Sequence, residues 1–569
     1  MTVCFTQQKD ANKLKISFRL LLLLCIVIAP LQACTRAGTT GSNEGTRHSW
    51  TRPGILRFAE NADPKTLNPL LGSSAVTGDL SMFLFSYAVR YNDKAQPIPD
   101  ALREIPTLEN GDVSKDGKTL KYKLRPNVKW HDGQPLTSKD LWFTWKAVMN
   151  THNNVVTTDG YKDIASIDYV NPHVAVVHMK RLYAPFLQQL WGVNGNAPIL
   201  PEHILGKYND DKGSLNTATY NSAPVGSAPF KFVSWQRGSS VRLVAFPEFY
   251  LGKPKLNQVI FKILPDENTL LTQLQTHEID LLARGTGLNW PRYTAIATPE
   301  SGLKAIRVHS FQYAHIDFNL RRPLFADLRV RKALAFATNR AEIIDKIAHG
   351  SADPAPADQS PELSWAYTPD VELHDYDPDK ARQLLDQAGW KVGRDGIRTK
   401  NGQRLAFDHS TQTESTNGKA IQALVQREWH DVGADVTVKN APTNSFFDNT
   451  VNGVLQGGHY DVAGFSWVAS ADPDDSAIYS ADNLAPHGQN ALFWADKPAT
   501  DAMNAALRTV DRNQRKAQYK IVQQRLASQV PTIILYFLQE PEVYNTDLKG
   551  FDPPSPVISP FWNPWEYSI

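Results

Sequence analysis

Cysteine is almost absent from this chain of 569 residues, which contains three cysteines. They stand at positions 4, 25 and 34, so the long remainder of the chain has no thiol and can form no internal disulfide bond. A chain of this length can bury a core large enough for stability without cross-links. We therefore expect packing and hydrogen bonding to hold the folded part together.

An excess of charge of one sign is also absent. Lys and Arg number 60 and Asp and Glu number 58, which gives a formal net charge of +2. Residues 1–33 carry four basic residues and one acidic residue, so their removal would leave a net charge close to −1. A nearly neutral chain has no electrostatic reason to bind nucleic acid, and we expect no such partner.

Long hydrophobic runs are missing except near the N-terminus. Three basic residues precede an uninterrupted apolar run over residues 20–29. Such a run would rise roughly 15 Å as a helix, about half of a bilayer core, which is typical of an export signal and not of a membrane anchor. The sequence Leu31-Gln32-Ala33-Cys34 then resembles a bacterial lipobox, where the signal is removed before a cysteine that receives lipid.

The N-terminal pattern therefore predicts a signal peptide over residues 1–33 and lipid attachment at Cys34. The protein would lie outside the cytoplasm, anchored to the cell membrane, on the periplasmic side if the cell has an outer membrane. The alternative is an ordinary signal peptide that happens to contain a cysteine. Residues 34–52 are rich in Gly, Ser, Thr and Asn and lack a hydrophobic period, which is typical of a flexible tether.

Motifs for catalysis and metal binding are missing as well. The chain contains no Gly-x-Ser-x-Gly, no His-Glu-x-x-His and no Cys-x-x-Cys. Gly117-Lys118-Thr119 imitates the end of a phosphate-binding loop, but Asp112 stands where the first glycine is required. The 15 histidines show no ligand spacing. We expect no catalytic residue, no metal ion and no cofactor.

Local patterns after the tether predict a compact mixed α/β fold. Residues 120–124 alternate apolar and basic side chains and follow an Asp-Gly turn, as a half-buried strand does. Thr137 and Asp140 are spaced as a capping pair at the start of a helix. Asp377 and Pro378 predict the start of another helix, which Gly389 would end. Residues 532–537 predict a buried strand.

One long motif resembles a known family. Residues 123–140 read KLRPNVKWHDGQPLTSKD and are similar to the "kLR-x-x-v-k-F-h-D-G-x-P-l-t-a-x-D" signature of family 5 extracellular solute-binding proteins, the peptide-binding components of ABC importers. Residues 325–333 resemble the family's "f-x-D-x-R-V-R-x-A", in which Asp327 would cap a helix. Residues 376–390 resemble its "Y-D-P-x-K-A-x-x-L-L-x-x-A-G-W". The resemblance covers essentially the whole chain after the tether.

The resemblance implies a two-lobed α/β clamp of the type II periplasmic-binding-protein kind. Lobe I would span residues 53–308, with an extra subdomain at about 84–222. Lobe II would span residues 309–534, and residues 535–569 would return to lobe I. Hinged lobes of this kind close on a small ligand.

The implied function is that of a monomeric lipoprotein that captures peptides or peptide-like solutes. It would deliver them to an ABC permease and its ATPase, with no catalytic step. Three alternatives remain at this point. The same scaffold could bind a metal chelate, a sugar, an opine or haem. The protein could instead be an envelope peptidase, or a lipoprotein with a structural or sensing role.

The resemblance also points to candidate ligand-binding residues. Peptide binders of the family hold the ligand's ammonium group with an acid in patterns such as Trp-x-x-Asp. Here Trp467 is followed by Ser470 at the acid position if no gap is assumed, and Asp472 could replace it. Ser73 and Ser74 align with a lobe I loop that touches peptide backbone. The structural alternatives are a core tryptophan, a turn at Asp472 and a surface turn at the two serines. We favour loss of the acid, which predicts a preference for ligands without a free ammonium group.

Overall fold

The computed structural model describes residues 47–72, 74–193, 197–210, 213–282, 290–448, 450–486, 488–551 and 560–569. The chain divides into two units, Met1–Arg47 and His48–Ile569, and the description below concerns the second unit. Cys34 and Ser73 lie outside the described residues. None of the helices within the described ranges is both long enough and apolar enough to cross a membrane.

The described chain combines helices and strands, as the sequence predicts. The helices are α1 Ala75–Leu84, α2 Ser138–Met149, α3 Phe186–Gln189, α4 Glu202–Leu205, α5 Glu267–Gln275, α6 Trp290–Ile296, α7 Leu328–Phe336, α8 Arg340–Lys346, α9 Pro378–Gln387, α10 Thr416–Asp431, α11 Thr443–Phe446, α12 Ser476–Tyr479, α13 Lys497–Ala506 and α14 Arg512–Gln529. The strands are β1 Ile55–Glu60, β2 Val89–Tyr91, β3 Pro97–Pro99, β4 Thr119–Lys123, β5 Ile164–Asn171, β6 Val174–Met179, β7 Phe230–Gln236, β8 Ser240–Ala245, β9 Gln258–Ile263, β10 Leu281–Leu282, β11 Leu303–Phe318, β12 Ala352–Pro354, β13 Lys391–Val392, β14 Arg398–Lys400, β15 Gln403–Arg404, β16 Ala406–Ser410, β17 Asp435–Val438, β18 Val462–Val468 and β19 Thr532–Asn545.

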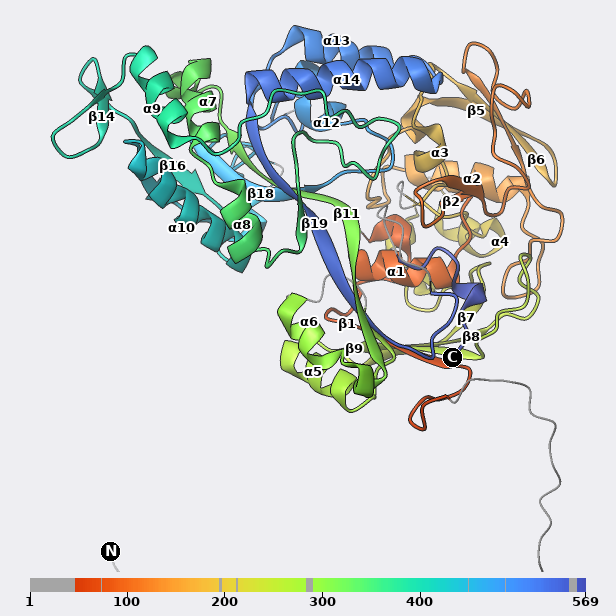
Figure 1. Ribbon diagram of the computed structural model, residues 1–569. Coiled ribbons are helices and arrows are strands. Elements are labelled where there is room, and N and C mark those ends of the chain that lie inside the picture. Colours follow the sequence, from red (N-terminus) through yellow and green to blue (C-terminus); the bar gives the residue numbers. More distant parts are fainter. Residues whose placement is uncertain are drawn as a thin grey trace, which may run out of the picture. The chain divides into compact units, whose positions relative to one another are not determined.

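One large mixed sheet organises the described chain. Its 11 strands follow the order β17-β16-β18-β11-β19-β10-β1-β9-β8-β7, and β12 pairs with β19 beside this path. The two long strands β11 and β19 run side by side and antiparallel through its middle (Figure 1). Their register is irregular between His309 and Tyr313. The predicted buried strand over residues 532–537 is confirmed as the first half of β19, which continues to Asn545.

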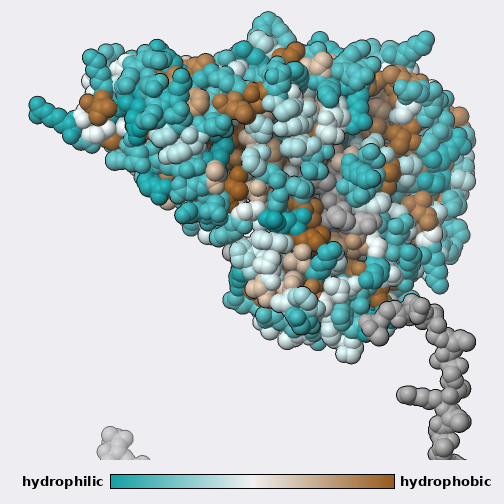
Figure 2. All heavy atoms as spheres, in the orientation of Figure 1, coloured by the Kyte–Doolittle hydropathy of each residue, from teal (hydrophilic) through white to brown (hydrophobic). Residues whose placement is uncertain are grey.

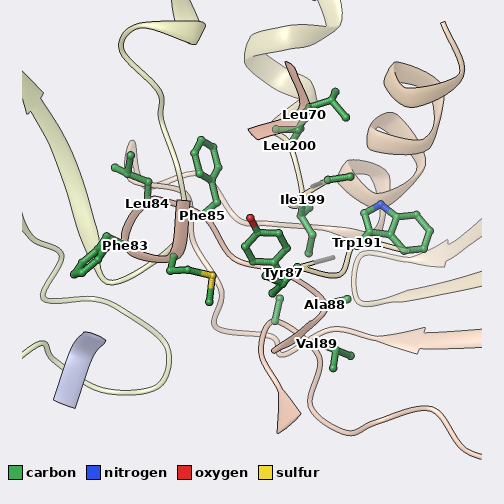
Figure 3. Packing of buried hydrophobic residues seen from close by; sticks show 14 of the residues in the cluster. Leu70, Phe83, Leu84, Phe85, Tyr87, Ala88, Val89, Trp191, Ile199 and Leu200 are labelled. Carbon is green, nitrogen blue, oxygen red and sulfur yellow. The ribbon is translucent and has the colours of Figure 1, made fainter. Parts of the chain in front are cut away.

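Separate hydrophobic cores lie along this sheet. The largest packs α1, β1, β7, β8 and β9 with the chain between residues 84 and 220, and its buried rings include Phe83, Phe85 and Trp191 (Figure 3). A second core packs α7, α9 and α10 against β11, β16, β18 and β19. On the face shown in Figure 2, hydrophilic side chains cover most of the surface. Burial of this extent is consistent with stability without disulfide bonds.

The local sequence signals correspond to real elements. The predicted strand is β4, and Gly117 in the turn before it has a φ of +65°. Thr137 and Asp140 form a capping box at the start of α2. The Asp377 side chain caps α9, with Pro378 in the first turn and Gly389 beyond its end at a φ of +86°. The Asp327 side chain caps α7. Each signal is a short-range interaction, which explains why the sequence alone revealed it.

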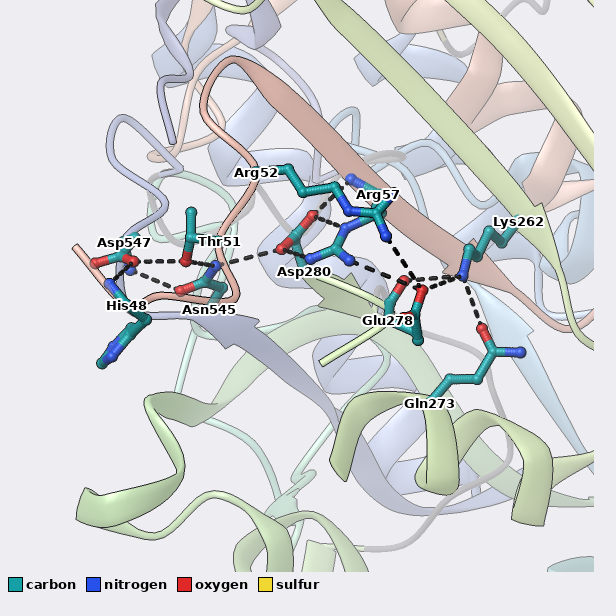
Figure 4. Close-up of polar contacts among 10 residues, drawn as sticks. All are labelled: His48, Thr51, Arg52, Arg57, Lys262, Gln273, Glu278, Asp280, Asn545 and Asp547. Carbon is teal, nitrogen blue, oxygen red and sulfur yellow. Dashed lines mark hydrogen bonds and ion pairs between the residues drawn. The ribbon is translucent and has the colours of Figure 1, made fainter. Parts of the chain in front are cut away.

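A buried ion pair ties the first strand to the end of the chain. The Arg57 Nε and Nη2 atoms donate to the two carboxylate oxygens of Asp280 at 2.8 and 2.7 Å (Figure 4). The Asn545 amide donates to Asp280 Oδ1 at 3.3 Å. Arg57 is 2% exposed and Asp280 is not exposed, so each buried charge is balanced by the other. The pair fixes β1, β10 and β19 side by side.

Candidate functional site

Strand β18 has one edge that is only partly paired. On one side it pairs with β11 along its whole length, from Val462 opposite Phe318 to Val468 opposite Gln312. On the other side β16 pairs with Val462 and Ala463 alone. Residues 464–468 therefore have no strand partner on this side among the described residues. A free strand edge presents backbone N–H and C=O groups to any extended chain that lies beside it.

A pocket of about 330 Å³ lies over this edge, and we call it the edge pocket. Gly464, Phe465 and Ser466 all line it. Ser466 pairs with Ala314, and Ala314 pairs with Tyr536, so these three residues share one face of the sheet, and the pocket that they line lies over that face and reaches the free edge of β18 at Gly464, Phe465 and Ser466. Its remaining lining residues come from β11, β16, α10 and β19 and the loops beside them: Gln312, Ala314, His315, His409, Gln412, Ser415, Asn417, Gly418, Ile421, Phe447, Leu535, Tyr536 and Leu538.

A second pocket, of about 300 Å³, lies against one face of β18, and we call it the apolar pocket. Phe465 and Trp467 both line it, as expected for residues two apart on a strand. The other lining residues are Asp317, Phe447, Leu455, Gln456, Ile478, Gln489, Ala491 and Leu492. Phe447 and Phe465 line both pockets, so the two pockets adjoin.

Several buried polar atoms in the walls of these pockets have no hydrogen-bond partner. They are Nδ1 and Nε2 of His315 and His409, Nε2 of Gln412, Oε1 of Gln456, Nε1 of Trp467 and Oδ1 of Asp317. Burial lowers the pKa of His409 to about 4, so its ring is neutral at pH 7. Buried polar atoms are nearly always bonded to protein or water, so this concentration marks a place where a ligand or water supplies the bonds.

Ser470 and Asp472 lie in the loop after β18 and make contacts within the chain. The Ser470 hydroxyl donates to the backbone oxygen of Asp472 at 2.6 Å and accepts from its backbone nitrogen at 3.2 Å. The Asp472 carboxylate accepts a bond of 2.5 Å from Arg515 Nη2, and the exposed fractions of the two side chains are 7% and 8%. Burial alone would lower the pKa of Arg515, but Asp472 raises it above its usual value. The charge of Asp472 is thus already balanced.

Arg515 and Asp472 also border a third pocket, of about 450 Å³, that joins distant segments of the chain. Tyr91, Glu109 and Phe186 line one side of it, and Trp365, Arg512 and Arg515 line the other. Ala471 packs into the same hydrophobic core as Tyr91. The loop after β18 therefore contacts the segment predicted as the extra subdomain.

The structure brings the predicted residues together only in part. Trp467 lines the apolar pocket, and Ser470 and Asp472 follow it in one loop. Ser74 lies elsewhere, because its side chain caps α1 by accepting from Thr77 N at 3.3 Å, and it lines none of the three pockets. Ser73 and Cys34 are outside the described residues.

Sequence reasoning missed Asp317, Gln412 and Arg515. The sequence does contain a signal for Asp317. Residues 313, 315 and 317 are polar or partly polar and alternate with apolar residues, in a strand whose second half is buried on both faces. Arg515 carried none, since it lies 43 residues from Asp472 on a helix of many charged residues. Among the described residues, no three His, Cys, Asp or Glu side chains are grouped as a metal ion would require.

Comparison with known proteins gives a consistent result. Residues 101–487 match the model of the bacterial extracellular solute-binding proteins, family 5 (Middle). The oligopeptide-binding protein AppA of Bacillus subtilis is 27% identical over 550 residues, which cover 94% of this chain and 96% of that protein.

Solved structures agree with this comparison. NikZ of Campylobacter jejuni in complex with Ni(L-His) is 27% identical with a TM-score of 0.75, covering 91% of this chain and 100% of that one. AppA of Bacillus subtilis in complex with a nonapeptide is 24% identical with a TM-score of 0.72, covering 91% of this chain and 99% of that one. The chain belongs to the family 5 bacterial extracellular solute-binding proteins and has their two-lobed clamp fold.

Proposed function

We propose that this protein is a solute-binding lipoprotein of an ABC importer and that it binds peptides or peptide-like solutes along the free edge of β18. The observation that carries the proposal is the unpaired stretch of residues 464–468, of which Gly464, Phe465 and Ser466 line the edge pocket. A relative that covers nearly the whole chain is named an oligopeptide-binding protein.

The geometry suits an extended backbone. A peptide added as a strand would form backbone hydrogen bonds with β18, which do not depend on the peptide's sequence. Its side chains would alternate between the face of the apolar pocket and the opposite face, toward the start of α10. Water in these pockets would bridge the remaining polar groups and so permit varied side chains.

The domain organisation belongs to the same proposal. Lobe I would comprise residues 53–308 with the subdomain at about 84–222, lobe II residues 309–534, and residues 535–569 would return to lobe I. The crossing between lobes would then lie on β11 and β19, where the pairing register is irregular between His309 and Tyr313. A monomer, attached to the membrane by lipid on Cys34 after loss of residues 1–33, would present this clamp to the permease and its ATPase.

The amino end of the ligand would find no free acid at the predicted position. Ser470 is held in a turn and the charge of Asp472 is balanced by Arg515. Leaving an ammonium group unpaired in a closed cleft costs several kcal/mol. We therefore propose a preference for ligands whose amino end is blocked, absent or paired elsewhere.

A metal chelate is the second candidate ligand. NikZ, crystallised with Ni(L-His), is as similar in sequence as the oligopeptide-binding relative. The edge pocket also contains two imidazoles, His315 and His409, whose nitrogens make no hydrogen bond. Neutral imidazole is a common metal ligand.

Backbone methylation of a peptide tests strand addition directly. A peptide bound at a strand edge uses the N–H of every second residue, so single N-methyl groups should weaken binding at alternate positions only. Calorimetry on a series of hexapeptides, each methylated at one position, measures this pattern. Equal tolerance at all positions would rule out pairing with β18.

The amino end is tested in the same assay with free and N-acetylated forms of one peptide. We expect the acetylated form to bind at least tenfold tighter to the wild type and to Ser470→Ala. If the free form binds tightly and loses its affinity in Asp472→Asn, Asp472 is the anchor after all. Tight binding of nickel–histidine with no binding of any peptide would favour the metal chelate.

A further inference from the structure

Asp317 is a buried carboxylate that accepts no hydrogen bond among the described residues. It lies on β11, is 1% exposed and forms part of the wall of the apolar pocket. Its Oδ1 atom is buried without a hydrogen-bond partner. Among the described residues, the one basic group within 4 Å of it is His315, whose Nε2 lies 3.5 Å from Oδ1, too far for a good hydrogen bond. A buried charge without partners is costly, so a protein keeps one only where something else pairs with it.

Among the described residues, the nearby hydroxyl groups have hydrogen-bond partners other than Asp317. The hydroxyls of Tyr313 and Tyr479 contact each other at 3.0 Å. The Tyr460 hydroxyl donates to the backbone oxygen of Ala491 at 2.7 Å. Of the described residues that line the apolar pocket, none is basic. The carboxylate therefore faces a cavity that offers it no cation.

The rest of the cavity suits a cation on an apolar stem. Phe447, Phe465 and Trp467 supply aromatic surface, which attracts a cation as well as methylene groups. Gln456 Oε1 is a second buried acceptor without a hydrogen-bond partner. The nitrogen of the same amide donates to Gly488 O at 3.1 Å, which fixes the orientation of the amide. These two acceptors, in a pocket lined mostly by apolar side chains, match a group with several N–H donors.

The pocket also lies where a ligand side chain would arrive. Asp317, Phe465 and Trp467 are on one face of the sheet, because Asp317 pairs with Ala463 and residues two apart on a strand share a face. Phe465 borders the edge pocket too, so a peptide beside β18 would have every second side chain directed toward this face.

We propose that the apolar pocket receives a cationic side chain of the bound solute, a guanidinium or ammonium group on an apolar stem, and that Asp317 is its charge partner. The inference rests on the proposed binding of peptide-like solutes at β18 and names the side chain that this site selects. Solutes with arginine or lysine at one position of the bound segment are then preferred over neutral analogues of the same length.

The test uses alanine hexapeptides with arginine, lysine or norleucine placed at each position in turn. Norleucine keeps the stem of lysine without its charge. Calorimetry should show, at one position, at least tenfold tighter binding of the arginine or lysine peptide. Asp317→Asn should remove that preference, so that the arginine, lysine and norleucine peptides bind alike at this position. Asp408→Asn is the matched control. It removes a carboxylate of β16, the strand next to β18, and this carboxylate contacts Lys439 at 3.5 Å and lines neither pocket.

Stability of the ligand-free protein separates a binding role from a structural one. If Asp317 awaits a cation, Asp317→Asn should not lower the melting temperature. A clear decrease, with the arginine preference intact, would make the carboxylate a structural partner of His315 and overturn the proposal.

A small probe separates this proposal from the proposed function. If peptides bind but no position favours a cation, the pocket assignment is wrong and peptide binding stands. If no peptide binds, yet n-butylguanidine raises the melting temperature of the wild type and not of Asp317→Asn, the cation pocket stands and the peptide function is wrong. If neither probe binds, both are wrong.

Discussion

Asp472→Asn should destabilise the protein, because it leaves the guanidinium of Arg515 buried without its anion. The two side chains meet at 2.5 Å and are each less than a tenth exposed. Among the described residues, Arg515 Nη2 has one further hydrogen-bond partner, the Tyr519 hydroxyl at 2.9 Å, which carries no charge. Removing one member of a buried ion pair costs about 3–5 kcal/mol.

The expected shift in melting temperature is modest despite this cost. Unfolding entropy near 60 °C is about 2 cal/mol/K per residue, so a unit of this size has roughly 1 kcal/mol/K. A loss of about 3–5 kcal/mol therefore lowers the melting temperature by about 3–5 °C. Denaturant unfolding followed by tryptophan fluorescence resolves the loss of free energy more directly.

A double variant decides whether the pair explains the loss. Replacing both residues, as Asp472→Asn with Arg515→Met, removes the unpaired charge and should recover most of the lost free energy. Ser470→Ala is the matched control in the same loop, since within the described part of the chain its hydroxyl bonds only to backbone atoms of Asp472, and it should cost about 1 kcal/mol. A loss below about 1 kcal/mol in Asp472→Asn, or a double variant no better than the single one, would refute the reasoning.

Three further predictions address export, motion and pH. Cys34→Ala should leave the precursor uncut or release a soluble protein, as membrane fractionation and mass spectrometry would show; wild-type protein without lipid on Cys34 contradicts this. A saturating ligand should reduce the radius of gyration measured by X-ray scattering and raise the melting temperature, because only the folded, closed form binds; an unchanged radius argues against clamp closure. His409 has a folded pKa of about 4, below its unfolded value near 6.5, so its contribution to stability is complete above pH 6.5 and falls as the pH drops toward 4. Denaturant unfolding at pH 6.5 and pH 4 should show that His409 lowers the free energy of unfolding by up to about 3 kcal/mol at the lower pH, a loss that is absent in His409→Gln. The same loss in the variant would mean that another residue causes it.

The features that the sequence predicted correctly depend on neighbours in the chain. Asp377 caps α9, Thr137 and Asp140 form their capping box, and Gly117 occupies its turn, because each requires only residues a few positions away. The order of such signals along the chain carried the family resemblance, which the comparison with known proteins confirmed. Trp467 was proposed for the site from that resemblance and not from its surroundings, and its role in ligand binding stays a prediction.

The chemistry of the site was decided by tertiary structure. No spacing in the sequence shows that Arg515 reaches Asp472 across 43 residues, or that Ser74 turns away to cap a helix. The free edge of β18 exists because β16 stops pairing after Ser410, and Asp317 faces a cavity because β11 and β18 meet in one particular register. Local sequence determines hydrogen bonds within a few residues. The partner of a buried charge depends on which distant segments the fold brings together, and only packing of the whole chain fixes that.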